Sequence, residues 1–230
     1  MEQQKLIVLT GAGISAESGL RTFRDSDGLW EGYNIADVAT PRAWKRDAQL
    51  VQDFYNMRRR DVVAAQPNAA HIGLARLQEH FDVHIITQNI DDLHERAGSK
   101  NVLHLHGEIV KMRSEFDTET LYPITGDITM DMKAPDGGRI RHHVVWFEEP
   151  VPMIDHAVPL MQEADIFVLV GTSLAVYPAA GLVDFVEDHV PKYVMDKRIP
   201  EVKRFRNVIP IEQPATEGIL TLFERLGIAY

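Results

Sequence analysis

Short runs of apolar residues alternate along this chain with longer stretches in which apolar positions recur every three or four residues. Continuous short runs are typical of buried strands, and the wider spacing is typical of helices. The expected strands cover residues 5–10, 83–86, 144–147, 166–170, 192–195 and 207–211. Helices are expected within residues 41–80 and over 154–163, 178–189 and 217–226. This alternation predicts an α/β protein with a parallel, doubly wound sheet.

Glycine-rich turns follow two of these strands. They are Gly11-Ala12-Gly13, with Ala16 three residues later, and Gly171-Thr172-Ser173. Such a G-x-G-x-x-A pattern, after a strand and before a helix, lets backbone N–H groups approach a pyrophosphate. The alternative is a glycine turn that serves close packing alone. No acidic strand end stands about 20 residues on, where a dinucleotide site usually has one. Residues 21–30 instead predict a charged loop that could fold over a ligand.

Polar residues also gather where the strand at 83–86 ends. Gln88, Asn89 and Asp91 follow it, and His106 stands just before a glycine in the next segment. Amide and carboxylate groups suit a polar ligand that carries a carboxamide and sugar hydroxyls. A histidine can serve as a general base near neutral pH. The alternatives are a helix N-cap formed by Asp91 or Asp92 and an Asp-Asp-x-x-His metal site, which lacks further ligands at a usual spacing.

The fold prediction would bring these segments together. Ligands bind beyond the carboxyl ends of parallel strands, and right-handed crossovers place those ends along one edge. Gly11, Asn89, Gly171 and Asp196 are expected there. In the helical stretch, Asp47 can cap a helix on which Tyr55 and Arg58 share one side. The neighbouring run of three arginines, residues 58–60, is equally typical of a solvated helix face.

Composition excludes several functions. The 230 residues include 24 Lys and Arg against 34 Asp and Glu, so the net charge of −10 argues against general binding to nucleic acid or anionic membranes. The absence of cysteine excludes disulfides, thiol nucleophiles and thiolate metal sites. No apolar run reaches the length of a membrane span, and the first residues lead directly into a strand, so we expect a cytoplasmic protein.

Taken together, in order and spacing, these segments resemble the sirtuins over nearly the whole chain. The matching segments are Gly11-Ala12-Gly13-Ile14-Ser15, Phe23-Arg24, Thr87-Gln88-Asn89-Ile90-Asp91, His106-Gly107-Glu108, Val144-Val145-Trp146-Phe147 and Gly171-Thr172-Ser173. The resemblance implies one catalytic domain over 1–230, with a Rossmann-type large part and a smaller domain formed by two insertions. The large part would comprise 1–30, 68–108 and 148–230, the helical insertion 31–67 and the small module 109–147.

The resemblance also implies an activity and a set of site residues. NAD would be consumed as a co-substrate, and the acyl group of a modified lysine would pass to ADP-ribose with release of nicotinamide. His106, as general base, would act with Asn89 and Asp91. NAD would contact Gly11, Ala12, Gly13, Ala16, Phe23, Arg24, Trp30, Gln88, Asn89, Ile90, Asp91, His106, Gly171, Thr172, Ser173, Asp196 and Ala215.

The acylated lysine of a protein or peptide would lie on the other side of the site. Val145 and Phe147 would flank its tunnel on a strand that pairs with the peptide. Tyr55 and Arg58 match a pair found in sirtuins that remove succinyl or malonyl groups, because a phenol and a guanidinium suit a carboxylate. An ADP-ribosyltransferase or NAD hydrolase, and an NAD-binding module without catalysis, remain the alternatives.

Three departures from the sirtuin pattern stand out. Glu148 replaces a usual glycine, and Asp196 replaces a usual asparagine near the adenine ribose. The thiolates that hold a structural zinc are missing, so we expect a small module without metal. Apolar packing would compensate, among Met112, Phe116, Leu121, Tyr122, Ile124, Ile128, Met130 and Ile140.

Overall fold

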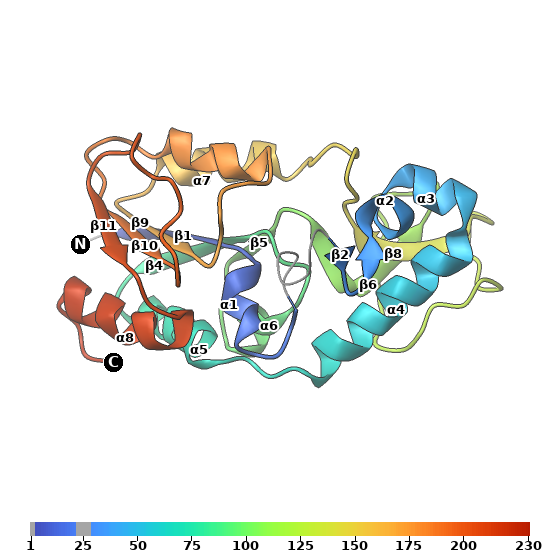
Figure 1. Ribbon diagram of the computed structural model, residues 1–230, viewed down its shortest axis with the longest axis horizontal. Coiled ribbons are helices and arrows are strands. Elements are labelled where there is room, and N and C mark those ends of the chain that lie inside the picture. Colours follow the sequence, from blue (N-terminus) through green and yellow to red (C-terminus); the bar gives the residue numbers. More distant parts are fainter. Residues whose placement is uncertain (1–2, 22–28) are drawn as a thin grey trace.

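The computed structural model describes residues 3–21 and 29–230, and its main feature is a sheet of six parallel strands (Figure 1). Across the sheet they are β11 (Val208–Ile211), β10 (Lys192–Met195), β9 (Ile166–Val170), β1 (Lys5–Thr10), β4 (Asp82–Thr87) and β5 (Val102–His104). Counted by their order in the chain, the strands follow the 3-2-1-4-5-6 arrangement of the Rossmann fold. The predicted fold class is confirmed, and the strand order reverses between β1 and β9.

Helices cover both faces of this sheet, which is why its central strands are apolar on both sides. In β1, Leu6 and Val8 pack into one core and Ile7 and Leu9 into the other, because successive strand residues point to opposite faces. The first core lies under α5 (Ala69–Arg76) and α8 (Ala215–Leu226), and the second under α7 (Ile154–Gln162) and η2 (Ala179–Phe185) (Figure 1). The short helices α1 (Ala12–Ala16), η1 (Leu77–Glu79) and α6 (Leu93–Arg96) complete this part.

A third core joins the two insertions. Antiparallel strands β7 (Tyr122–Pro123), β6 (Gly107–Ser114) and β8 (Ile140–Val144) form a small sheet. It lies beside α2 (Ile35–Val38), α3 (Pro41–Arg46), α4 (Ala48–Ala64) and the hairpin of β2 (Leu29–Trp30) and β3 (Tyr33–Asn34) (Figure 1). Trp44 and Phe54 of the helices share one core with Val144 and Trp146. Asp47 caps α4 as the pattern predicts, through the Leu50 N–H at 2.9 Å.

Polar side chains of α4 bind the small sheet to the helices. The buried guanidinium of Arg59 donates to the carbonyls of Ile109 at 2.8 Å and Gly126 at 2.6 Å, and it also contacts His142. Burial lowers the pKa of Arg59 to about 10. The Asn56 amide pairs with both backbone groups of Ile128, each at 2.9 Å. These bonds join segments that the sequence places about 50 to 80 residues apart.

Some details differ from the sequence-based expectations. The alternative of a solvated face for the arginine run is wrong, because Arg58 and Arg59 are buried and only the third arginine is exposed. Ile128 and Ile140 are buried in the small module as expected, whereas Phe116 is 73% exposed. The last part of the helical stretch expected within 41–80 is α-helical only as far as Arg76 and then tightens into η1.

Two expected elements have different forms. The strand expected at 144–147 is β8, which ends at Val144, because the next amides turn away: Val145 bonds to the His106 carbonyl and Phe147 to that of Ala39. The helix expected at 178–189 is the 3₁₀ helix η2 over Ala179–Phe185, which contains the poor helix former Gly181. Among the helices built from residues 3–21 and 29–230, none combines the length and apolarity that a bilayer crossing demands.

Candidate active site

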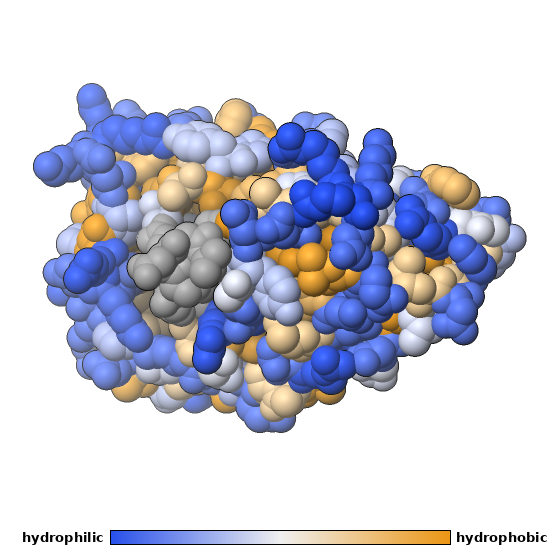
Figure 2. Space-filling view, turned by 45° about the vertical axis from the view of Figure 1, so that its right-hand side comes forward, coloured by the Kyte–Doolittle hydropathy of each residue, from blue (hydrophilic) through white to orange (hydrophobic). Residues whose placement is uncertain are grey.

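A cavity of about 500 Å³ opens between the carboxyl ends of the parallel strands and the small module. It lies at the point where the strand order reverses, which is where ligands bind in such folds. Figure 2 shows a patch of hydrophobic surface near the middle of one face, bordered by hydrophilic side chains. The cavity wall includes these residues expected from the sequence: Gly11, Ala12, Gly13, Ala16, Trp30, Tyr55, Arg58, Gln88, Asn89, Ile90, Asp91, His106, Val145, Phe147, Gly171, Thr172, Ser173, Asp196 and Ala215. Phe23 and Arg24 lie outside the described residues.

The two glycine turns pack directly against each other at one end of the cavity. The Gly13 N–H donates to the Gly171 carbonyl at 2.8 Å, and a Cβ on Gly13 would lie 2.6 Å from the Gly171 Cα. Gly171 has a φ of +60°, which other residues rarely adopt. Close packing therefore requires glycine at both positions. It also leaves a backbone-lined recess without side chains, which suits a phosphate-containing ligand.

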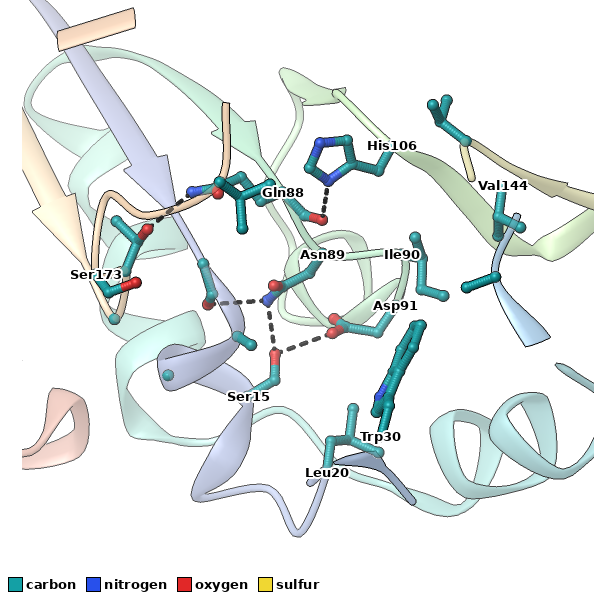
Figure 3. Close-up of a pocket in the computed structure, with 18 of the residues that line it drawn as sticks. Ser15, Leu20, Trp30, Gln88, Asn89, Ile90, Asp91, His106, Val144 and Ser173 are labelled. Carbon is teal, nitrogen blue, oxygen red and sulfur yellow. Dashed lines mark hydrogen bonds between the residues drawn. The ribbon is translucent and has the colours of Figure 1, made fainter. Parts of the chain in front are cut away.

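Ser15 connects the first glycine turn to the loop after β4. Its hydroxyl donates to Asp91 Oδ2 at 3.0 Å and accepts from Asn89 Nδ2 at 3.1 Å, as Figure 3 shows. The same Asn89 amide donates to the Gly11 carbonyl at 3.1 Å. Both of these bonds use Nδ2 of Asn89, so its Oδ1 can accept from a ligand. Burial raises the pKa of Asp91, while the bonds from the Leu93 N–H and Ser15 oppose that rise.

His106 is held in one orientation by the backbone of Gln88. Its Nδ1 lies 2.8 Å from the Gln88 carbonyl, which can only accept, so Nδ1 carries the proton (Figure 3). The neutral ring then keeps Nε2 unprotonated, as a general base requires. Burial lowers the pKa of His106, and the bond to Gln88 opposes that shift. The ring therefore stays neutral at and below the pH at which a free histidine would protonate.

A second histidine, His104, fixes the backbone of the loop after β4. His104 Nδ1 lies 3.1 Å from the Asn89 carbonyl, and its Nε2 lies 2.7 Å from Glu95 Oε1. Burial would lower the pKa of His104, but the hydrogen bond and charge of Glu95 outweigh burial and raise it. His104 thus acts as a fixed donor to the loop that carries Asn89.

Tyr55 and Arg58 lie at the end of the cavity nearest the small module. Tyr55 is buried, and burial raises its pKa, so the phenol remains a neutral donor. Arg58 packs over the Trp30 ring at 5.5 Å and bonds to Glu31 at 2.7 Å. Tyr55 and Arg58 both line the cavity.

A buried histidine under the site predicts loss of stability in acid. His71 Nδ1 accepts from the Asn68 N–H at 3.3 Å and completes a capping box of α5. Burial lowers its pKa to about 4. The unfolded chain, with a histidine pKa near 6.5, binds the proton first. Stability is therefore retained above that pH and lost as the pH falls from about 6.5 to about 4, by at most about 1.4 kcal/mol per pH unit.

Between pH 7 and pH 5, the free energy of unfolding should fall in wild type and in His71→Gln. We expect the fall to be about 1–2 kcal/mol smaller in His71→Gln. Urea unfolding at the two pH values measures the difference. The exposed His80→Gln variant, from η1's end, is the matched control and should keep the wild-type drop. Equal drops in all three proteins would contradict the assignment.

The zinc that the sirtuin resemblance implies does not fit the residues of the small module. Ser114 bonds to Asp136 at 2.9 Å, and Glu115 forms an ion pair with Arg139 at 2.8 Å. The bond from Arg139 lowers the pKa of Glu115 to about 2. Within the described ranges, the small module has no cluster of three His, Asp or Glu ligands drawn from its own residues. Such a cluster among the described residues is Glu95, His104 and Glu108, beside the loop after β4, where each side chain already has a protein partner.

Some residues of the site were missed from the sequence. Ser15 was part of the glycine motif, but nothing local indicated that it would bond to Asp91, 76 residues away. Tyr177 and Pro178 also line the cavity, and their position soon after the second glycine turn was the available signal. Glu31, which bonds to the lining residue Arg58, directly follows the loop expected at 21–30 and had no local signal of its own.

Comparison with known proteins places this geometry in a family. The sequence pattern described as "Sir2 family" matches residues 11–178. An NAD-dependent protein deacylase of Helicobacter pylori is 45% identical over 223 residues, covering 97% of each chain. One from Aggregatibacter actinomycetemcomitans is 52% identical over 190 residues, covering 83% of this chain and 91% of its own.

A solved structure, titled as a Sir2 homolog–NAD complex, superimposes with a TM-score of 0.87 at 35% identity, covering 98% of this chain and 90% of its own. The extent of the family match and the identity over nearly full-length relatives agree with the strand order and with the cavity. The chain belongs to the Sir2 family.

Proposed function

We propose that this chain is an NAD-dependent protein-lysine deacylase that removes acetyl groups and also acidic acyl groups such as succinyl and malonyl. The observation that carries the proposal is one cavity lined together by a histidine base, an amide–carboxylate loop and a buried arginine. The relatives named above are deacylases that use NAD. A base aimed into such a cavity argues for catalysis rather than for binding alone.

The residues present fit NAD. Gly11, Gly13 and Gly171 leave a recess that a Cβ would fill, which suits a pyrophosphate. Asp196, at the end of β10, and Ala215, at the start of α8, border the same cavity where the adenosine half would extend. When bound, NAD would supply the ADP-ribose that accepts the acyl group and a nicotinamide that can leave.

The catalytic loop would orient the nicotinamide side. Asn89, fixed by Ser15 and the Gly11 carbonyl, presents Oδ1 to ribose hydroxyls. Ile90 and Asp91 would hold the carboxamide, with Asp91 kept in place by Ser15 and the Leu93 N–H. Holding the nicotinamide ring out of its relaxed geometry favours its departure, because the contacts of Ile90 and Asp91 with the carboxamide would strengthen toward the transition state.

His106 would then move the proton. Its Nε2 is the base that accepts a proton from the ribose hydroxyls, while the Gln88 carbonyl keeps Nδ1–H in place. The lowered pKa of His106 keeps this base neutral at pH 7. One water molecule from solvent would be consumed, and the products would be deacylated lysine, nicotinamide and O-acyl-ADP-ribose.

The peptide would reach the cavity past Val145 and Phe147. Their backbone amides already bond within the protein, so the expected pairing of a β8 extension with the peptide would have to use the other backbone groups of this segment. Glu148 stands beside it with a φ of +73° and pairs with Arg42. A positive φ explains why a glycine is usual at this position.

A panel of acyl-lysine peptides incubated with NAD tests the proposal. One peptide sequence would carry acetyl, propionyl, succinyl or malonyl lysine, and mass spectrometry would follow deacylated peptide, nicotinamide and O-acyl-ADP-ribose. We expect the three products in equal amounts, and only with acylated peptide. Nicotinamide release that does not depend on acyl-lysine would instead indicate an NAD hydrolase or an ADP-ribosyltransferase.

We also predict that the protein needs no structural metal. Ion pairs and hydrogen bonds of Glu115, Arg59 and Asn56 hold the small module where sirtuins use zinc. Treatment with EDTA should therefore leave activity and Tm unchanged. A structural zinc contributes about 10 kcal/mol in small finger peptides, so its removal would be obvious in a thermal melt. Stoichiometric zinc in the purified protein, or unfolding on chelation, would show that another ligand set is used.

A further inference from the structure

Arg58 is not an empty carboxylate receptor, because a carboxylate of the protein already contacts it. Its Nη1 lies 2.7 Å from Glu31 Oε1, and the two side chains are only 7% and 13% exposed. Ion pairs this far from water are stronger than surface pairs, and breaking one leaves a costly charge behind. Any acidic acyl group that reaches Arg58 must therefore share it with Glu31 or displace Glu31.

Glu31 occupies a position that its backbone disfavours. It follows β2 in a two-residue hairpin turn, with a φ of +51°, and Gly32 follows with a φ of +81°. Such turns usually have Asn or Asp followed by Gly, because both central residues must adopt positive φ. A glutamate there carries backbone strain, which is typical of residues kept for their side chain.

The remaining donors of Arg58 point to an unfilled role. Its Nε is buried and, among the described residues, has no hydrogen-bond partner, although Arg58 lines the cavity. A guanidinium offers its five N–H donors in a planar fork that fits a carboxylate through two bonds. Glu31 accepts from one of these donors, Nη1, so the other N–H groups of the guanidinium remain for a second carboxylate.

Glu31 also has an alternative partner, Arg21, which lines the same cavity as Arg58 but is far more exposed. Arg21 Nη1 lies 3.7 Å from Glu31 Oε2, and the Arg21 side chain is 75% exposed. The carboxylate thus lies between an inner guanidinium and an outer one. A small rotation toward Arg21 would release Arg58 without leaving Glu31 uncompensated.

We propose that Glu31 sets the acyl selectivity of the site by competing with the carboxylate of a succinyl or malonyl group for Arg58 and moving toward Arg21 when that carboxylate binds. This inference rests on the proposed recognition of acidic acyl groups by Arg58. A neutral acetyl group does not compete with Glu31, so the residue lowers the efficiency for acidic acyl groups alone.

Paired kinetics on acetyl-lysine and succinyl-lysine forms of one peptide test the inference. In Glu31→Gln the ratio of succinyl to acetyl kcat/KM should rise about tenfold, mainly through a lower KM for the succinyl peptide, since one charge-assisted bond no longer has to be exchanged. In the double variant with Arg58→Met the gain should vanish, because the two residues act through one interaction.

Two further variants control the result. Asp37→Asn removes an exposed carboxylate six residues away, paired with Arg46, and should leave the ratio within about twofold of wild type. Arg21→Gln removes the outer partner of Glu31, so Glu31 should leave Arg58 less readily and the ratio of succinyl to acetyl kcat/KM should fall. This variant tests the inference even if Glu31→Gln does not fold. A lower or unchanged ratio in folded Glu31→Gln, as measured by Tm, would overturn the inference and make Glu31 a support for Arg58. Full desuccinylation by Arg58→Met alone would instead overturn the proposed function.

Discussion

Replacing His106 with alanine should lower the rate of deacylation by about 10²–10⁴, the usual contribution of a general base. The loss should appear in kcat for every acyl-lysine peptide, because the base acts after the acyl group is in place. NAD binding and Tm should change little, since the ring is only partly buried and makes one hydrogen bond, to the Gln88 carbonyl. Steady-state kinetics, calorimetric titration with NAD and a thermal melt measure the three quantities.

His80→Ala is the matched control for this result, because it removes an exposed histidine outside the cavity and should keep wild-type kinetics. In wild type, the lowered pKa of His106 places the acid limb of the pH–rate profile below the usual histidine pKa of about 6.5. The rate should therefore be kept as the pH falls to that value and decline only below it, as Nε2 becomes protonated. Full activity of His106→Ala would show that the histidine is structural.

Arg58→Met should reduce kcat/KM for succinyl-lysine about one hundredfold and leave deacetylation largely intact. The variant removes charge-assisted bonds worth about 1.5–3 kcal/mol and keeps a side chain of similar length against Trp30. A succinyl carboxylate would then lie beside Glu31 without the Arg58 guanidinium between them, which adds a repulsion that acetyl does not feel. Competition between the two peptides in one reaction reports the ratio directly.

Arg60→Met provides the control for charge, because Arg60 is exposed and pairs with Asp127 on the outside of the same helix. Its kinetics on both peptides should match those of wild type. Equal losses on both substrates in Arg58→Met, with a lower Tm, would assign Arg58 a folding role instead.

Local patterns were sufficient to predict most of the fold and much of the site. Apolar periodicity placed the parallel strands, because burial on both faces demands a continuous apolar run, as in β1 and β9. Asp47 was recognisable as a helix cap from its position alone. Strand-end polar residues and glycine turns predicted one edge of the sheet, and Gln88, Asn89, Asp91 and His106 do line one cavity there.

Pairings between distant segments depended on the tertiary structure. The apolar run at 144–147 is typical of a strand, yet its amides bond to the carbonyls of His106 and Ala39. β8 therefore ends at Val144, the first residue of this run. The glycines of the first turn suggested a ligand. In the structure, the close contact with Gly171 is what leaves no room for a side chain at these positions.

The arginine run shows the same limit most clearly. Sequence alone determined that Arg58 and Arg59 lie on a helix. A run of like charges does not indicate which groups elsewhere in the chain will bond to them. Their burial follows from partners far along the chain: Glu31 for Arg58, and the Ile109 carbonyl and His142 for Arg59. A buried charge is tolerated only where such partners converge, and that convergence exists only in the folded chain.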